Sequence, residues 1–183
     1  MGTDAWQPII NAQVRQEQRD EELTALYMRQ LANLFQSFVA PYPVRTMVGQ
    51  LKYYMLHVAP HPRGLRAMND VTYRVAHEYA GEREHSEAAR GKQLAFADLL
   101  EPTPTPEESE QQTITRLAED IYALGKQRGL ITFGRIQDEF AVALFGRVLE
   151  RHFRAACRSL IGQGKASIGA ESKIVDKTLL SFK

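Results

Sequence analysis

The fold of this chain is decided by residues 146–162, GRVLERHFRAACRSLIG. Apolar side chains recur there at helical spacing, and an arginine stands two residues before each of them; the apolar series is Leu149, Phe153, Ala156 and Leu160. Two residues rotate by about 200° around a helix axis, so the two series lie on opposite faces. The spacing predicts a helix with one face toward a core and one solvent face that carries Arg147, Arg151, Arg154 and Arg158.

The residues on both sides of this helix predict the rest of a small module. Upstream, apolar residues at helical spacing over 114–124 predict a helix that Arg128 and Gly129 close with a cation and a terminal glycine. Leu130 and Ile131 predict a short edge strand, and Thr132 predicts the cap of a short second helix. Downstream, 165–169 and 178–183 predict two strands around a polar loop. Three helices and a hairpin in this order are typical of a winged helix-turn-helix, which we predict for residues 111–183.

The charge of this module favours a polyanionic partner. From Leu144 to Lys183 there are eight basic residues and three acidic ones, whereas the net charge of all 183 residues is only +1. Arginine on a helix face can contact phosphates and guanine edges in the major groove. We therefore expect a nucleic-acid interface, although winged helices also serve as dimerisation or protein-docking modules and a purely structural role stays open. The expected interface residues are Arg147, Arg151, Arg154, Arg158, Lys165, Lys173 and Lys177.

A stretch rich in proline and acidic residues precedes the module. Residues 101–110 read EPTPTPEESE, with proline at positions 102, 104 and 106. Proline lacks the amide hydrogen that helices and sheets need, so we expect an extended acidic linker over 98–110.

The first half of the chain predicts helix, hairpin and helix. Apolar residues at helical spacing over 23–38 predict the first helix, which Pro41 and Pro43 should end. The runs 44–48 and 51–58 are rich in β-branched and aromatic residues and predict the two strands. Pro62 is well placed to begin a second helix over 65–79. The expected fold class is α+β, mainly α.

Composition excludes several classes of protein. A single cysteine, Cys157, rules out an intramolecular disulfide framework and a cysteine-rich zinc site, and its most economical role is to fill a core. The longest apolar stretches are far shorter than the roughly twenty residues that span a bilayer. With no signal-peptide pattern at the start, we expect a cytoplasmic protein that does not enter membranes.

No catalytic or cofactor motif can be assembled from this sequence. A nucleotide or methyl-donor site of the doubly wound type needs a glycine-rich turn directly after a parallel strand, whereas Gly162 and Gly164 follow a helix. The histidine pairs, His57 with His61 and His77 with His85, lack a carboxylate at a ligand-like spacing. We therefore expect no catalytic residue, no metal and no cofactor in this chain.

Several short motifs together resemble a known family, the three-Cys-motif partner proteins (TcmP), which are methyltransferase-like. The similarity extends over most of the chain and matches the C-terminal half of that family; its motifs are Trp6, Leu26-Tyr27, Pro43-Val44-Arg45, Gly49, Tyr53-Tyr54-Met55-Leu56 and His61-Pro62-Arg63-Gly64. In that family a Rossmann-type domain ends in a helix, a strand hairpin and another helix, and a winged helix follows.

The resemblance implies that residues 1–97 are the helix–hairpin–helix remnant of a Rossmann-type methyltransferase-like domain. The cofactor-binding half of the family has no counterpart here, so S-adenosylmethionine is expected only if an N-terminal part is missing. The chain is then either a non-catalytic fragment that binds nucleic acid or a truncated part of a methyltransferase. The family also implies a three-Cys-motif protein as a partner for docking. Because half a core would be exposed, we expect residues 1–97 to need another chain or further residues to fold.

Overall fold

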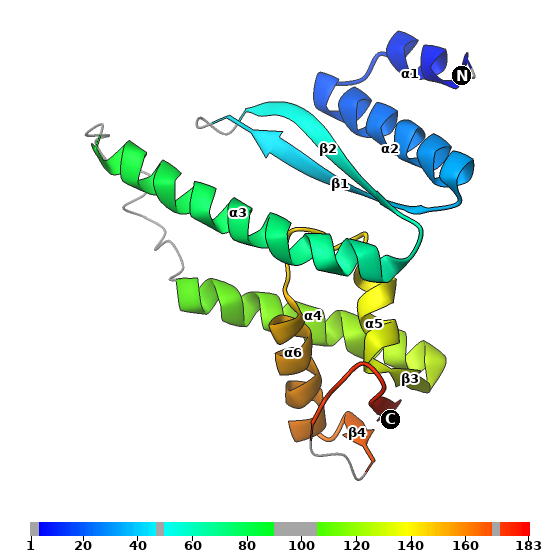
Figure 1. Ribbon diagram of the computed structural model, residues 1–183, viewed down its shortest axis with the longest axis vertical. Coiled ribbons are helices and arrows are strands. Elements are labelled where there is room, and N and C mark those ends of the chain that lie inside the picture. The colour runs from blue at the N-terminus through cyan, green and yellow to red at the C-terminus, as the bar shows by residue number, and fades with distance from the viewer. Residues whose placement is uncertain (1–3, 47–49, 90–105, 170–172) are drawn as a thin grey trace. The chain divides into compact units, whose positions relative to one another are not determined.

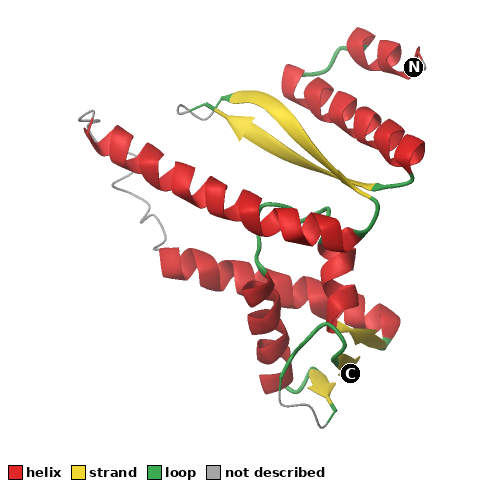
Figure 2. Cartoon of the chain, viewed as in Figure 1, coloured by secondary structure: helices red, strands yellow, loops and turns green. Residues whose placement is uncertain are grey.

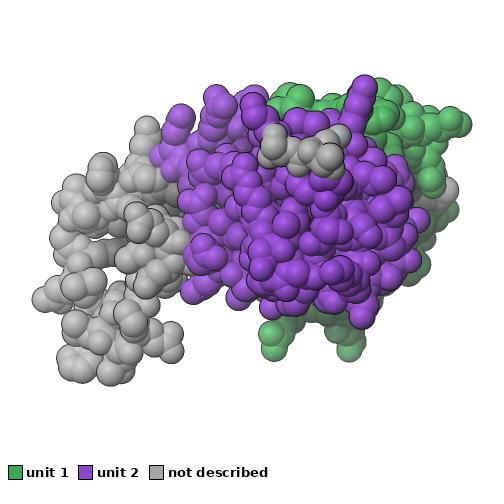
Figure 3. Space-filling model, turned by 90° about the horizontal axis from the view of Figure 1, so that it is seen from below, with its two compact units in different colours: residues 1–68, 141–145 green, residues 69–140, 146–183 purple. Residues whose placement is uncertain are grey.

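The computed structural model describes residues 4–46, 50–89, 106–169 and 173–183. The fold is mixed α+β and mainly helical, which confirms the expected class (Figures 1 and 2). The chain divides into two compact units (Figure 3). Unit 1 comprises residues 1–68 and 141–145, and unit 2 comprises residues 69–140 and 146–183.

Unit 1 is built on a two-stranded antiparallel sheet with helices before and after it. Its elements are the 3-10 helix η1 (Asp4–Trp6), α1 (Gln7–Asn11), α2 (Gln16–Phe35), β1 (Phe38–Arg45), β2 (Leu51–Ala59) and the start of α3 (Pro62–Ala89). Helix α2 ends at Gln36, whose left-handed backbone (φ 47°) lets the Ser37 N–H donate to the Ala32 carbonyl at 3.1 Å. Pro62 begins α3 as expected, since a proline in the first turn loses no helical hydrogen bond.

The first strand begins earlier than the sequence predicts. Pro41 and Pro43 lie inside β1, opposite Leu56 and Tyr54, instead of preceding it. Proline is tolerated in a strand where its missing N–H faces away from the neighbouring strand. Because the sheet has only the two strands β1 and β2 among the described residues, β1 offers such an edge along its whole length.

The core of unit 1 is small. Its buried members are Ala40, Ala59, Leu65 and Phe145. Gly64 is required beside them, because a Cβ there would lie 2.9 Å from that of Ala59. Many large apolar side chains of the unit remain exposed, among them Tyr27, Leu34, Phe35, Phe38, Tyr53, Met55 and Val58.

Unit 2 combines helices with a three-stranded antiparallel sheet. Its elements are the rest of α3, α4 (Pro106–Arg128), β3 (Leu130–Thr132), α5 (Phe133–Phe140), α6 (Glu150–Gly162), β4 (Ala166–Ile168) and β5 (Leu179–Phe182). The strand order is β3-β5-β4, with Ile131 opposite Leu180 and Ile168 opposite Leu180 on its other side. The expected edge strand and terminal hairpin are therefore both present.

Local signals in the sequence explain where these elements begin and end. Gly129 has a left-handed backbone (φ 71°) and its N–H donates to the Gly125 carbonyl at 2.7 Å, which closes α4. Thr132 caps α5 as predicted, since its hydroxyl accepts from the Arg135 N–H at 3.3 Å. The core that results contains Leu117, Ile121, Phe133, Ile136, Phe153, Ala156, Leu160 and Leu180.

The division between the units does not coincide with the expected linker 98–110. It falls between Met68 and Asn69, inside α3, because the residues of α3 from Asn69 onward pack with unit 2. Residues 98–105 lie outside the described part of the chain, and residues 106–110 form the first turn of α4. Pro106 suits that place, because the first helical residue needs no intrahelical donor.

No helix that the structure describes is both long enough and apolar enough to cross a bilayer.

Candidate functional site

Helix α6 has the two faces that the sequence predicts. Phe153, Ala156 and Leu160 are at most 6% exposed and form its inner face, together with His152 and Cys157. On the other side Arg151 and Arg158 are exposed and Arg154 is half-buried. At spacings of three and four residues these arginines lie along one line of the helix surface.

Arg147 is not part of that helix, which corrects the predicted four-arginine stripe. Helix α6 begins at Glu150, and its N-cap residue Leu149 has an extended backbone (φ −100°, ψ 165°). The Leu149 N–H donates to Nδ1 of His152 at 3.0 Å, so the side chain of the third helical residue satisfies the start of the helix. Arg147 is exposed in the loop before this cap.

That loop is held by a side chain from α3. Asn69 accepts a hydrogen bond from the Gly146 N–H through Oδ1 and donates one to the Val148 carbonyl through Nδ2, both at 2.6 Å. Gly146 has a left-handed backbone (φ 72°), which glycine adopts at little cost. The two bonds bracket Arg147 and fix the backbone on both sides of it.

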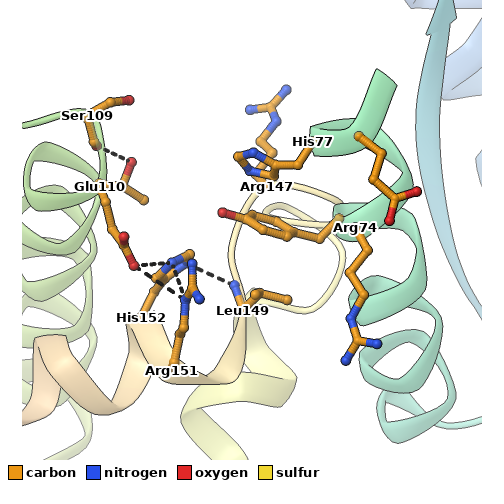
Figure 4. A pocket seen from close by; sticks show the side chains of 11 residues that line it. Arg74, His77, Ser109, Glu110, Arg147, Leu149, Arg151 and His152 are labelled. Atoms are coloured by element: carbon orange, nitrogen blue, oxygen red, sulfur yellow. Dashed lines mark hydrogen bonds and ion pairs between the residues drawn. The ribbon is translucent and has the colours of Figure 1, made fainter. Parts of the chain in front are cut away.

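A buried histidine connects the start of α6 to α4 (Figure 4). His152 is 2% exposed, and its Nε2 lies 3.1 Å from Oε1 of Glu110. Because Nδ1 accepts from Leu149, the neutral ring carries its proton on Nε2 and donates it to Glu110. Burial lowers the pKa of His152, Glu110 raises it and Arg151 lowers it, with burial the largest effect.

Two of the three helix arginines are paired with carboxylates. Nε of Arg151 lies 3.3 Å from Oε1 of Glu110, with the side chains 62% and 43% exposed. Arg154 pairs with Glu150 one turn earlier, while its Nε is buried without a hydrogen-bond partner among the described residues. Arg158 has no such partner in the described ranges of the chain and presents its full charge to solvent.

The three predicted lysines lie in and beside the β4–β5 hairpin. Lys165 immediately precedes β4, and its ammonium lies 5.4 Å from the centre of the Tyr122 ring. Lys173 and Lys177 are exposed in the connection before β5. Buried Thr178 orders this connection, because its hydroxyl donates to the Lys173 carbonyl at 3.1 Å and accepts from the Val175 N–H at 2.9 Å.

The same connection is attached to the start of α5. The N–H groups of Phe133 and Gly134 donate to the carbonyls of Thr178 and Asp176, each at 2.9 Å. Lys177 lies between these two acceptors, so its backbone is fixed relative to α5.

A cavity of about 750 Å³ opens at the start of α6. Figure 4 shows Arg74 and His77 on the α3 side, Ser109 and Glu110 on the α4 side, and Arg151 and His152 below them. The lining includes three arginines and two glutamates; the arginines are Arg74, Arg147 and Arg151. The cavity lining therefore carries both signs of charge.

No protein-family model, curated protein or solved structure matches this chain. The resemblance to the three-Cys-motif partner family therefore stays a prediction that rests on its short motifs.

The structure bears on two kinds of chemistry, metal binding and thiol reactivity. No group of three His, Cys, Asp or Glu side chains among the described residues lies close enough to hold a metal ion. Cys157 is fully buried, and burial raises the pKa of its thiol to about 12, so it lacks the thiolate that a nucleophile needs.

Sequence reasoning missed the residues that position the arginines. Asn69, Glu110 and His152 hold the start of α6, yet they come from three elements that lie 41 and 42 residues apart in the chain. Only the role of His152 could have been predicted locally, because a side chain with an acceptor three residues after a helix N-cap can accept from the N-cap N–H.

Proposed function

We propose that α4 to β5 form a winged helix-turn-helix that binds nucleic acid through the outer face of α6. The order helix, strand, helix, helix, strand, strand supports this fold, as does a three-stranded sheet with the last strand in its centre. In this arrangement α6 is the recognition helix and the β4–β5 hairpin is the wing.

One observation carries the proposal. The arginines of α6 project from the face opposite its fully buried side chains, so they are presented to a partner without disturbing the core. A recognition helix enters the major groove with its exposed side chains toward base edges, while flanking cations contact phosphates. Arg151, Arg154 and Arg158 suit the first position, and Lys165, Lys173 and Lys177 suit the second.

The ion pairs of these arginines with carboxylates indicate how readily each one can bind a phosphate. Arg158 and Arg147 have no carboxylate partner in the described part of the chain and are available to phosphate directly. To bind a phosphate, Arg151 and Arg154 must first break their ion pairs with Glu110 and Glu150, whose side chains are each 43% exposed. Such exposed pairs are weak, typically under about 1 kcal/mol, so a phosphate can displace the carboxylate.

The experiment is a salt titration of duplex-DNA binding by the full chain, followed by fluorescence anisotropy of a labelled duplex. Arg151→Ala with Arg154→Ala should weaken binding and lower the slope of log K against log salt by up to about 2, or about 0.9 for each phosphate that the variant no longer neutralises. Arg29→Ala with Arg63→Ala is the matched control, because it removes two exposed arginines from unit 1. This control should keep both the affinity and the slope.

A second variant tests the proposal in the opposite direction. Glu110→Gln retains an acceptor for His152 and removes the carboxylate that pairs with Arg151. It should tighten DNA binding and steepen the salt dependence. Equal binding by wild type, the double-alanine variant and the Gln variant would overturn the proposal, and salt-resistant, nuclease-resistant capture of a protein would favour docking instead.

A further inference from the structure

The two edges of the unit 1 sheet differ in whether they can accept another strand. Among the described residues β1 and β2 pair only with each other, so each presents its outer side to no strand. On β1 that side carries Pro41 and Pro43, which cannot donate a hydrogen bond to an added strand. On β2 the residues from Lys52 to Ala59 include no proline, so this edge can accept a strand.

The prolines also show which backbone groups of β2 point outward. An antiparallel pair alternates between residues that exchange two hydrogen bonds and residues that exchange none. Because proline has no N–H, the pairs Pro41–Leu56 and Pro43–Tyr54 are of the second kind, and so is Val39–Val58 in the same register. The N–H and C=O groups of Tyr54, Leu56 and Val58 therefore face the open edge.

The same three residues of β2 also line a groove. It has a volume of about 400 Å³ and lies between α2 and β2, lined by Thr24, Tyr27, Leu31, Tyr54, Leu56 and Val58. None of these side chains is charged, and Tyr27 and Val58 are 55% and 44% exposed. Tyr54, Leu56 and Val58 thus contribute both the outward backbone groups of β2 and part of an uncharged groove.

We propose that a second copy of this chain covers this edge, through antiparallel pairing of β2 with β2 of the partner subunit. The register that uses all three outward residues is centred on Leu56 and pairs Tyr54 with Val58 of the partner subunit. A strand that pairs with itself in this way makes a two-fold symmetric contact in which the same surface serves both subunits. The uncharged groove lets the two copies meet without repulsion between like charges.

The placement of the prolines favours a second copy over an unlimited array. The combined sheet has the order β1-β2-β2-β1, so both of its outer edges carry Pro41 and Pro43. Neither edge can then accept another strand, and assembly stops at two chains. A dimer is a closed state, and it removes the open edge that a monomer exposes to aggregation.

The first test measures the mass of the full chain in solution over a range of concentrations by sedimentation and by light scattering. We expect a dimer whose dissociation constant rises at least about tenfold in Leu56→Pro, which removes an outward N–H at the symmetry axis. The β1 ladder does not use that N–H, so far-UV circular dichroism should stay unchanged. Leu56→Lys, which places two like charges opposite each other, should weaken the dimer without restricting the backbone.

The second test is a cross-link. Leu56→Cys places two thiols at facing positions with Cα atoms about 5.5 Å apart, within the range of a disulfide. Oxidation should give a covalent dimer, because native Cys157 is buried and does not compete. Pro43→Cys is the matched control: in this register its thiols lie about 14 Å apart across the sheet, at three strand spacings, and about 14 Å apart along it, at four residues, so they should not cross-link. A monomer at every concentration, a dimer unaffected by both Leu56 variants, or cross-linking at position 43 in place of 56 would overturn the proposal.

Discussion

Replacement of Asn69 by alanine tests how the start of α6 is held. The side chain makes two hydrogen bonds of 2.6 Å, one to the Gly146 N–H and one to the Val148 carbonyl. Each such bond is worth about 1 kcal/mol net, and a group left partly buried without a partner adds to the loss. Asn69→Ala should therefore lower the free energy of unfolding by about 2–3 kcal/mol.

The assay is urea unfolding followed by far-UV circular dichroism at neutral pH. Asp70→Ala is the matched control, because Asp70 is the exposed neighbour on the same helix and its loss should change stability by no more than about 0.5 kcal/mol. Asn69→Asp keeps the acceptor for Gly146 but turns a carboxylate toward the Val148 carbonyl, so it should not rescue the loss. A cost below about 0.5 kcal/mol for Asn69→Ala would refute the view that α3 fixes this loop.

Three further predictions concern unit 2. Because burial holds the pKa of His152 below the ordinary value of 6.5, the unfolded chain binds its proton at higher pH than the folded one. The free energy of unfolding should thus fall as pH falls through 6.5 toward the lowered pKa. The fall should be smaller in His152→Gln, which does not titrate and whose side-chain oxygen can still accept from the Leu149 N–H. Equal pH slopes for the two proteins would contradict the reasoning. Gly125→Ala should cost about 1–3 kcal/mol in urea unfolding, because a methyl group there overlaps the ring of Phe182; an unchanged midpoint would show that the ring yields freely. Cys157 should not react with a thiol reagent in the native protein and should react fully in denaturant, since burial raises its pKa to about 12; rapid labelling of the native protein would be the contrary result.

The parts of the fold that depend on local signals could be predicted from the sequence. Apolar residues at helical spacing located the inner face of α6, Thr132 located the cap of α5, and Gly129 located the end of α4. Thr132 and Gly129 act on neighbours within about one turn of themselves, and the apolar face of α6 follows from the helical period alone, so nearby sequence suffices in each case.

The parts that depend on distant residues could not be predicted. Pro41 and Pro43 were expected to precede the first strand, because a proline inside a strand that is paired on both sides would remove a ladder hydrogen bond. The sheet leaves one side of β1 without a neighbouring strand, so both prolines fit inside it. Helix α6 begins three residues after Arg147, because the cap of Leu149 depends on His152 and the loop depends on Asn69. The pairing of Arg151 with Glu110 lowers its availability, and no spacing within α6 predicts it.

The position of β5 in its sheet has a consequence for how the protein folds during synthesis. β5 follows β3 and β4 along the chain but lies between them, with Ser181 opposite both Leu130 and Ser167. When β3 and β4 leave the ribosome they have no strand to pair with, whereas α4, α5 and α6 can already begin to pack. The three-stranded sheet of unit 2, with its positively charged hairpin, therefore cannot be completed until residues 179–182 have been added.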